Sequence, residues 1–87
     1  MQLFTYHFNG VILKSVAYSF LENDFLFFRV IISEGSECTI ASSGIPDTEN
    51  KTIWVQSHRS GETVLAHDLI QALGEGIERA GIISVGK

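Results

Sequence analysis

The stretch SGETVLAHDLIQALGEGIERAG, residues 60–81, has the pattern of an amphipathic helix. At about 100° per residue its apolar side chains fall within one broad arc, and its charged and amide side chains fill the opposite arc. The apolar arc consists of Leu65, Ala66, Leu69, Ile70, Ala72, Leu73, Ile77 and Ala80. We therefore expect one helix here, lying across whatever sheet the rest of the chain builds.

The ends of this stretch carry helix signals. Ser60 is the predicted N-cap, because its hydroxyl can accept a hydrogen bond from an unpaired first-turn N–H. Gly81 suits the left-handed position that follows the last helical residue. Within the stretch, Gly74 and Gly76 each cost roughly 1 kcal/mol relative to alanine. Gly76 points into the apolar arc, so we interpret it as a place where the helix backbone approaches the sheet closely.

Upstream of the predicted helix, the chain alternates between strand and turn patterns. Residues 1–8 alternate in hydrophobicity and are followed by Asn9-Gly10. That pair predicts a type I′ turn, because both central positions of such a turn need positive φ. A two-residue turn would pair Phe8 with Val11 and so set the register of the first hairpin.

Four further strands are expected, at residues 11–20, 25–33, 38–42 and 52–57. The segment 25–33, FLFFRVIIS, is apolar on both sides and predicts a central strand, because an edge strand of this composition would aggregate. Short connections make successive strands antiparallel neighbours. The predicted fold is thus a two-layer α+β domain spanning residues 1–87. It has an antiparallel meander of four or five strands, with one C-terminal helix packed on one face.

Composition excludes several classes of function. The net charge of −4 and the pI near 5.2 argue against nucleic acid as a partner, since its backbone attracts basic surfaces. No apolar run approaches the roughly 20 residues that span a bilayer, and the N-terminus lacks the features of a signal peptide. A single cysteine suits a reducing compartment. We expect a cytoplasmic protein that binds neither nucleic acid nor membrane.

The strongest candidate for a small-ligand site is the entry to the predicted helix, formed by His58, Arg59, Ser60 and Gly61. Free N–H groups, the helix dipole and an arginine together can hold a carboxylate or phosphate. The loop at residues 43–51 could contribute to the same site. These features give an alternative function, a small-ligand (anion) binding protein or small enzyme. Ordinary capping explains Ser60 and Gly61 equally well.

Catalysis and metal binding have weaker support. A Cys38 thiolate would need His58 or His67 within hydrogen-bond reach as a base. An inert, half-buried thiol is the common outcome for a cysteine in a strand. Cys38 and the three histidines do not stand at the spacing of metal ligands on one helix or tight loop. We therefore expect no catalytic residues, no metal and no cofactor.

Both sides of the segment 25–33 are apolar, and one helix can cover only one side of a five-stranded sheet. Leu26, Phe28, Val30 and Ile32 share one side, and Phe25, Phe27 and Ile31 share the other. The sequence leaves open which side the helix covers. If it covers the first, the exposed side is joined by Leu3, Ile12 and Val16 or by Phe4, Tyr6 and Leu13, and by Trp54 or by Ile53 with Val55.

A large exposed apolar face usually marks an interaction site. The leading hypothesis is therefore a non-enzymatic protein-interaction module, of the accessory or inhibitory kind that phages and mobile elements encode. The predicted interface residues are Phe25, Phe27, Ile31 and Trp54. We expect a second copy, in a homodimer, or another protein to cover this face. The competing interpretation is that residues 82–85 and the 43–51 loop fold across it.

Overall fold

The structure is a computed structural model and describes residues 1–33, 36–46 and 51–81. Five antiparallel strands pair in chain order, so β3 is central as predicted. The elements are β1 (Gln2–Phe8), β2 (Val11–Glu22), β3 (Phe25–Ser33), β4 (Ser36–Pro46), β5 (Thr52–Ser57) and α1 (His67–Ala80). The predicted α+β arrangement of a meander with one C-terminal helix is confirmed.

The first hairpin has the predicted turn and register. Asn9 and Gly10 have φ of 52° and 78°, as a type I′ turn requires, and Phe8 lies opposite Val11. A second turn uses the same conformation without glycine, because Asn23 has φ of 53° and Asp24 has φ of 68°. Asparagine and aspartate tolerate this left-handed region better than other side chains.

Two strands are longer than predicted. β2 continues to Glu22 rather than ending near residue 20, because the second turn needs only two residues. β4 runs from Ser36 to Pro46, so residues 43–46 of the predicted loop belong to a strand. Residues 47–50 of that loop lie outside the described residues, as do residues 82–85, which were considered as a cover for the open face.

The predicted start of the helix at Ser60 is wrong, because α1 begins at His67 with Ala66 as its N-cap. The backbone before it is bound elsewhere. The Thr63 N–H donates to Glu37 O, and the Gln56 side chain binds both Thr63 O and the Leu65 N–H. These bonds hold the segment extended against β4 and β5, so the helix cannot begin earlier. The predicted C-terminus is confirmed, since Gly81 has φ of 78°.

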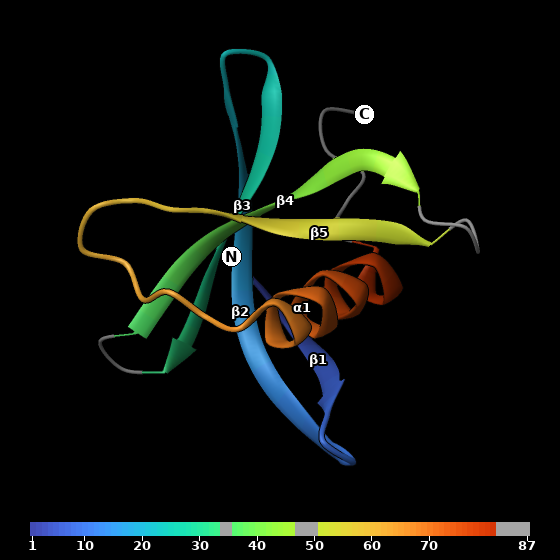
Figure 1. Ribbon diagram of the computed structural model, residues 1–87. Coiled ribbons are helices and arrows are strands. Elements are labelled where there is room, and N and C mark those ends of the chain that lie inside the picture. The colour runs from blue at the N-terminus through green and yellow to red at the C-terminus, as the bar shows by residue number, and fades with distance from the viewer. Residues whose placement is uncertain (34–35, 47–50, 82–87) are drawn as a thin grey trace.

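The core lies between α1 and the side of β3 that carries Phe28 and Val30, which settles the question that the sequence left open. The buried apolar residues are Phe4, Tyr6, Ala17, Phe28, Val30, Cys38, Ile40, Trp54, Ile70, Ala72, Leu73 and Ile77. Figure 1 shows α1 lying between β5 and β1, the two outermost strands of the curled sheet. The helix therefore packs against the sheet and also bridges its two edges.

Both edges of the sheet are covered where they meet α1. Gln71 replaces a neighbouring strand for β5: its Oε1 accepts from the Trp54 N–H at 3.0 Å, and its Nε2 donates to Thr52 O at 2.7 Å. On the other flank, a Cβ added to Gly76 would lie 2.5 Å from Thr5 O. The predicted close approach at Gly76 is thus confirmed. Where α1 covers these edges, no further strand can pair with them.

Candidate protein-interaction face

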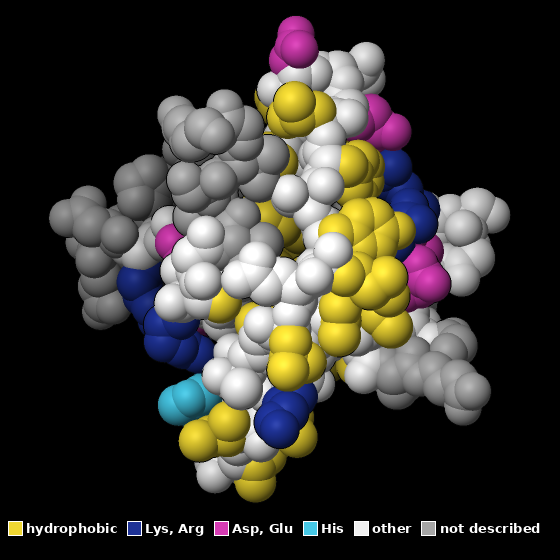
Figure 2. Space-filling view, turned by 180° about the vertical axis from the view of Figure 1, so that it is seen from behind, with side chains coloured by type: hydrophobic (Ala, Val, Ile, Leu, Met, Phe, Trp, Pro, Cys, Tyr) yellow, Lys and Arg dark blue, Asp and Glu magenta, His cyan; other side chains and the backbone are white. Residues whose placement is uncertain are grey.

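The side of the sheet opposite α1, called here the outer face, carries a set of apolar side chains that is interrupted by Lys14 on β2 and by Arg29 on β3. Alternation along the strands and the pairing of Val16 with both Leu3 and Ile31 place these residues together. We call this set the apolar stripe; it consists of Leu3, Ile12, Val16, Tyr18, Phe20, Phe25, Phe27 and Ile31. Figure 2 shows hydrophobic side chains gathered on this side of the molecule, bordered by basic and acidic ones.

Three members of the apolar stripe are exposed, and the other five are half-buried. The exposed fraction is 69% for Phe25, 65% for Ile12 and 60% for Leu3, whereas Phe28 on the other side of β3 is 1% exposed. Of the two predicted sets for β1 and β2, the one with Leu3, Ile12 and Val16 is therefore on the outer face. The alternation along β2 continues from Ile12 and Val16 to Tyr18 and Phe20. The sequence alone could therefore have identified Phe20 as a residue of the outer face.

The predicted interface residues divide between the two sides of the sheet. Phe25, Phe27 and Ile31 lie on the outer face. The prediction that Trp54 is an interface residue is wrong, because Trp54 is fully buried beneath α1. Its indole N–H donates to Glu78 Oε1 at 3.2 Å. Its neighbour Val55 is 40% exposed and takes the outer position on β5.

One end of the apolar stripe carries an ordered aromatic and arginine cluster. The Phe20 and Phe27 rings stack with centroids 5.7 Å apart. The Arg59 guanidinium carbon lies 5.0 Å from the Phe27 centroid and 5.6 Å from that of Phe20. Arg59 also donates to Glu22 Oε1 at 2.7 Å and to Oε2 at 3.3 Å. This bidentate pair fixes the guanidinium over the rings.

A second polar cluster anchors residues 58–63 over β3 and β4. Glu62, whose side chain is 8% exposed, accepts from Thr39 Oγ1 at 2.9 Å and lies 3.3 Å from Arg29 Nε. That nitrogen is too poorly aligned to count as a hydrogen-bond donor, so we treat the contact as an ion pair only. Arg29 is also 3.6 Å from Glu37. The sequence did not reveal that this segment would cover part of the outer face.

The predicted anion site loses its physical basis. The hypothesis placed His58, Arg59, Ser60 and Gly61 at a helix N-terminus, but α1 begins at His67. Ser60 and Gly61 instead lie in a turn that is closed by the Glu62 N–H, which donates to Arg59 O at 3.1 Å. The Arg59 charge, moreover, is already paired with a carboxylate.

The single cysteine is not suited to nucleophilic catalysis. Cys38 is fully buried, and this burial, followed by the nearby Glu62 charge, raises the pKa of its thiol to about 12. The thiolate that would be the nucleophile is therefore scarce at neutral pH. His67, a candidate base, is exposed on the surface of α1. Among the described residues, no three His, Cys, Asp or Glu side chains converge as a metal site.

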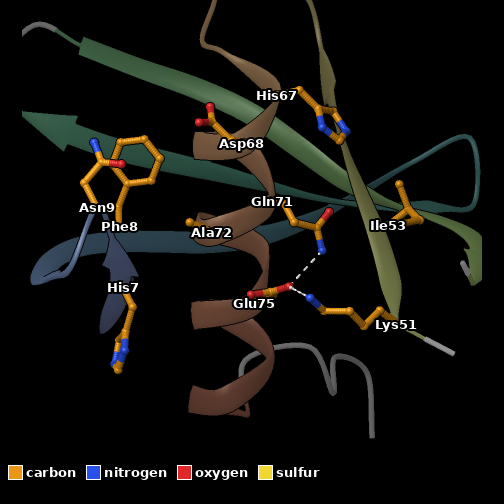
Figure 3. A pocket seen from close by; sticks show the side chains of 10 residues that line it. All are labelled: His7, Phe8, Asn9, Lys51, Ile53, His67, Asp68, Gln71, Ala72 and Glu75. Atoms are coloured by element: carbon orange, nitrogen blue, oxygen red, sulfur yellow. Dashed lines mark hydrogen bonds and ion pairs between the residues drawn. The ribbon is translucent and has the colours of Figure 1, made fainter. Parts of the chain in front are cut away.

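A shallow groove of about 520 Å³ runs over α1 between β1 and β5. Figure 3 shows that its lining side chains come from both flanks of the helix, with His7 and His67 on opposite sides. Glu75 is engaged by Gln71 Nε2 at 3.1 Å and by Lys51 Nζ at 3.4 Å. The groove therefore presents paired charges and two separated histidines, an arrangement without a catalytic pair among the described residues. No pattern in the sequence indicates this groove, because its lining residues come from segments far apart in the chain.

Comparisons with known proteins return no match, whether with protein-family models, with curated proteins or with solved structures. Within the described residues, no helix combines the length and the apolar character needed to cross a membrane.

Proposed function

We propose that this chain is a non-enzymatic protein-interaction module that binds through its outer face. The observation that supports this most strongly is the exposure of the apolar stripe. A solvated face of an antiparallel sheet is ordinarily polar, because water contacts it. Here the side chains of Phe25, Ile12 and Leu3 are each at least 60% exposed on one side of the sheet. A partner that buried them would gain roughly 25 cal/mol for each Å² of apolar surface removed from water.

The composition of the outer face also suits protein recognition. Aromatic and arginine residues are enriched among those that dominate binding energy at protein interfaces. Phe20, Phe27 and Arg59 form such a group, and the bidentate pair with Glu22 holds the arginine in place before any partner arrives. Less side-chain entropy would then be lost on binding.

The same proposal places the chain in a reducing compartment such as the cytoplasm. Its one cysteine is a free, buried thiol, as is common for proteins of that compartment. Fractionation of the native cells, followed by immunodetection, would test this location.

The experiment compares two adjacent substitutions on β2. Ile12→Ser removes an apolar side chain from the outer face, whereas Val11→Ser removes an exposed one, at 52%, from the other side of the same strand. Both sites are exposed, so each change should alter stability by about 0.5 kcal/mol or less. Protein captured from the native extract by the wild-type chain should be lost with Ile12→Ser and kept with Val11→Ser. Equal capture by both variants would contradict the proposal.

A further inference from the structure

We infer that the occupant of the outer face is a second copy of this chain, related by a two-fold axis; this rests on the proposed function above. A two-fold interface must be self-complementary, because the same patch is used on both sides. The inference is carried by the order of charges and apolar side chains along the outer side of β2.

The outer side of β2 reads Lys14, Val16, Tyr18, Phe20, Glu22. A cation and an anion thus stand at equal distances from Tyr18, each about 13 Å away at the usual rise of a strand. A two-fold axis through Tyr18, in the plane of the interface and perpendicular to the strand, would reverse one β2 over the other. Lys14 of each copy would then lie against the Glu22 carboxylate of the other, which also pairs with Arg59, and Val16 would approach the Arg59 guanidinium that lies over Phe20.

The alternative stacking is disfavoured by the same charges. With the axis parallel to β2 and lying over it, each Glu22–Arg59 pair would face its counterpart, and Lys14 would face Lys14. Like charges brought together in this way are repulsive. Lys14 forms no ion pair with any residue that the structure describes. Glu22 is already paired with Arg59, but its side chain is 48% exposed, so its carboxylate can accept from a second cation.

The charge of the outer face as a whole permits a second copy. The chain carries −4 overall, so two copies repel at long range. Among the described residues of the outer face, however, three cations balance three anions: Lys14, Arg29 and Arg59 against Glu22, Glu37 and Glu62. Two such faces can meet without net repulsion.

Where α1 covers the edge strands β1 and β5, a second copy cannot pair with them. Gln71 occupies the outward backbone groups of Thr52 and Trp54 on β5, and Gly76 lies against Thr5 O on β1. A second copy cannot add a strand at these positions while α1 is in place. On the described part of the chain, the outer face offers exposed apolar side chains that self-association could bury.

The test uses charge reversal and mixing, read by sedimentation equilibrium. The wild-type chain should be dimeric at high micromolar concentration. Lys14→Glu alone and Glu22→Lys alone should each weaken the dimer roughly tenfold or more, because each places like charges together. An equimolar mixture of the two variants should restore association, since both contacts then join opposite charges. Arg79→Glu, an equal charge change on the exposed side of α1, should leave the dimer intact.

Circular dichroism of each variant before mixing confirms that it is folded. A wild-type chain that stays monomeric overturns the inference, as does a dimer that both single variants preserve or that mixing fails to restore. A monomeric wild type would leave the proposed function to be judged by the Ile12→Ser and Val11→Ser comparison. The inference of a second copy can therefore fail while the proposed function stands.

Discussion

Replacing Gly76 by alanine tests the close contact between α1 and β1. We expect this change to lower the free energy of unfolding, although helix propensity alone would raise it. Alanine in place of glycine within a helix ordinarily gains about 1 kcal/mol. At Gly76, however, the new Cβ would lie 2.5 Å from Thr5 O, 2.9 Å from Tyr6 Cβ and 3.0 Å from Phe4 Cδ2. Carbon contacts are optimal near 3.5–4.0 Å, so α1 would have to withdraw from β1 by about 1 Å.

That withdrawal would loosen the packing of Leu73 and Ile77, which are fully buried. Overpacking of a core costs about 1–3 kcal/mol, and the upper end applies because a backbone oxygen cannot rotate away. Subtracting the propensity gain leaves a net loss of about 2 kcal/mol. For a domain of this size, the thermal midpoint should fall by roughly 8–16 °C.

Thermal unfolding followed by circular dichroism measures this change. The reverse substitution at the exposed end of α1, Ala80→Gly, supplies the control, since it should show the propensity cost of about 1 kcal/mol or less without any clash. A midpoint for Gly76→Ala equal to or above that of the wild type would refute the close approach of α1 to β1.

Three further outcomes follow from particular contacts. Gln71→Leu leaves the Trp54 N–H and the Thr52 carbonyl of β5 unpaired, so the free energy of unfolding should fall by roughly 1–3 kcal/mol. The Trp54 amide hydrogen should also exchange faster, as measured by NMR, and an unchanged exchange rate would count against coverage of this edge by Gln71. Glu62→Ala should release the segment that it anchors, so trypsin should cleave after Arg59 more rapidly, and an unaltered cleavage rate would contradict that anchoring. Because burial raises the pKa of the Cys38 thiol from about 9 to about 12, the unfolded chain loses this proton first as pH rises. The free energy of unfolding should therefore decline across that window, more steeply in the wild type than in Cys38→Ala, and parallel curves would disprove the assignment.

Much of the fold could be predicted from local sequence patterns. The Asn9-Gly10 turn set the first register because few other residue pairs tolerate positive φ at both central positions. The two-sided apolar segment FLFFRVIIS identified the central strand, since only a strand with neighbours on both edges suits it. Gly76 indicated a close approach because glycine in an apolar helical arc needs a steric reason.

The errors came from contacts between segments distant in sequence. Ser60 resembles an N-cap locally, but the Gln56 side chain and Glu37 O take the backbone groups of residues 63–65 and delay the helix to His67. Trp54 alternates with two apolar neighbours, so its side of the sheet depended on where α1 would pack. The anchoring of Arg59 to Glu22 joins residues 37 positions apart, which no periodicity could indicate.

Hydroxyl-radical footprinting tests most directly whether a partner covers the outer face. The experiment compares dilute isolated protein with the protein in its native extract. Tyr18 and Phe25 lie on the outer face, whereas the exposed His67 on α1 serves as an internal reference. The proposal predicts that oxidation of Tyr18 and Phe25 falls in the extract while that of His67 is unchanged. Equal oxidation of Tyr18 and Phe25 in both samples would contradict an interaction face on this side of the sheet.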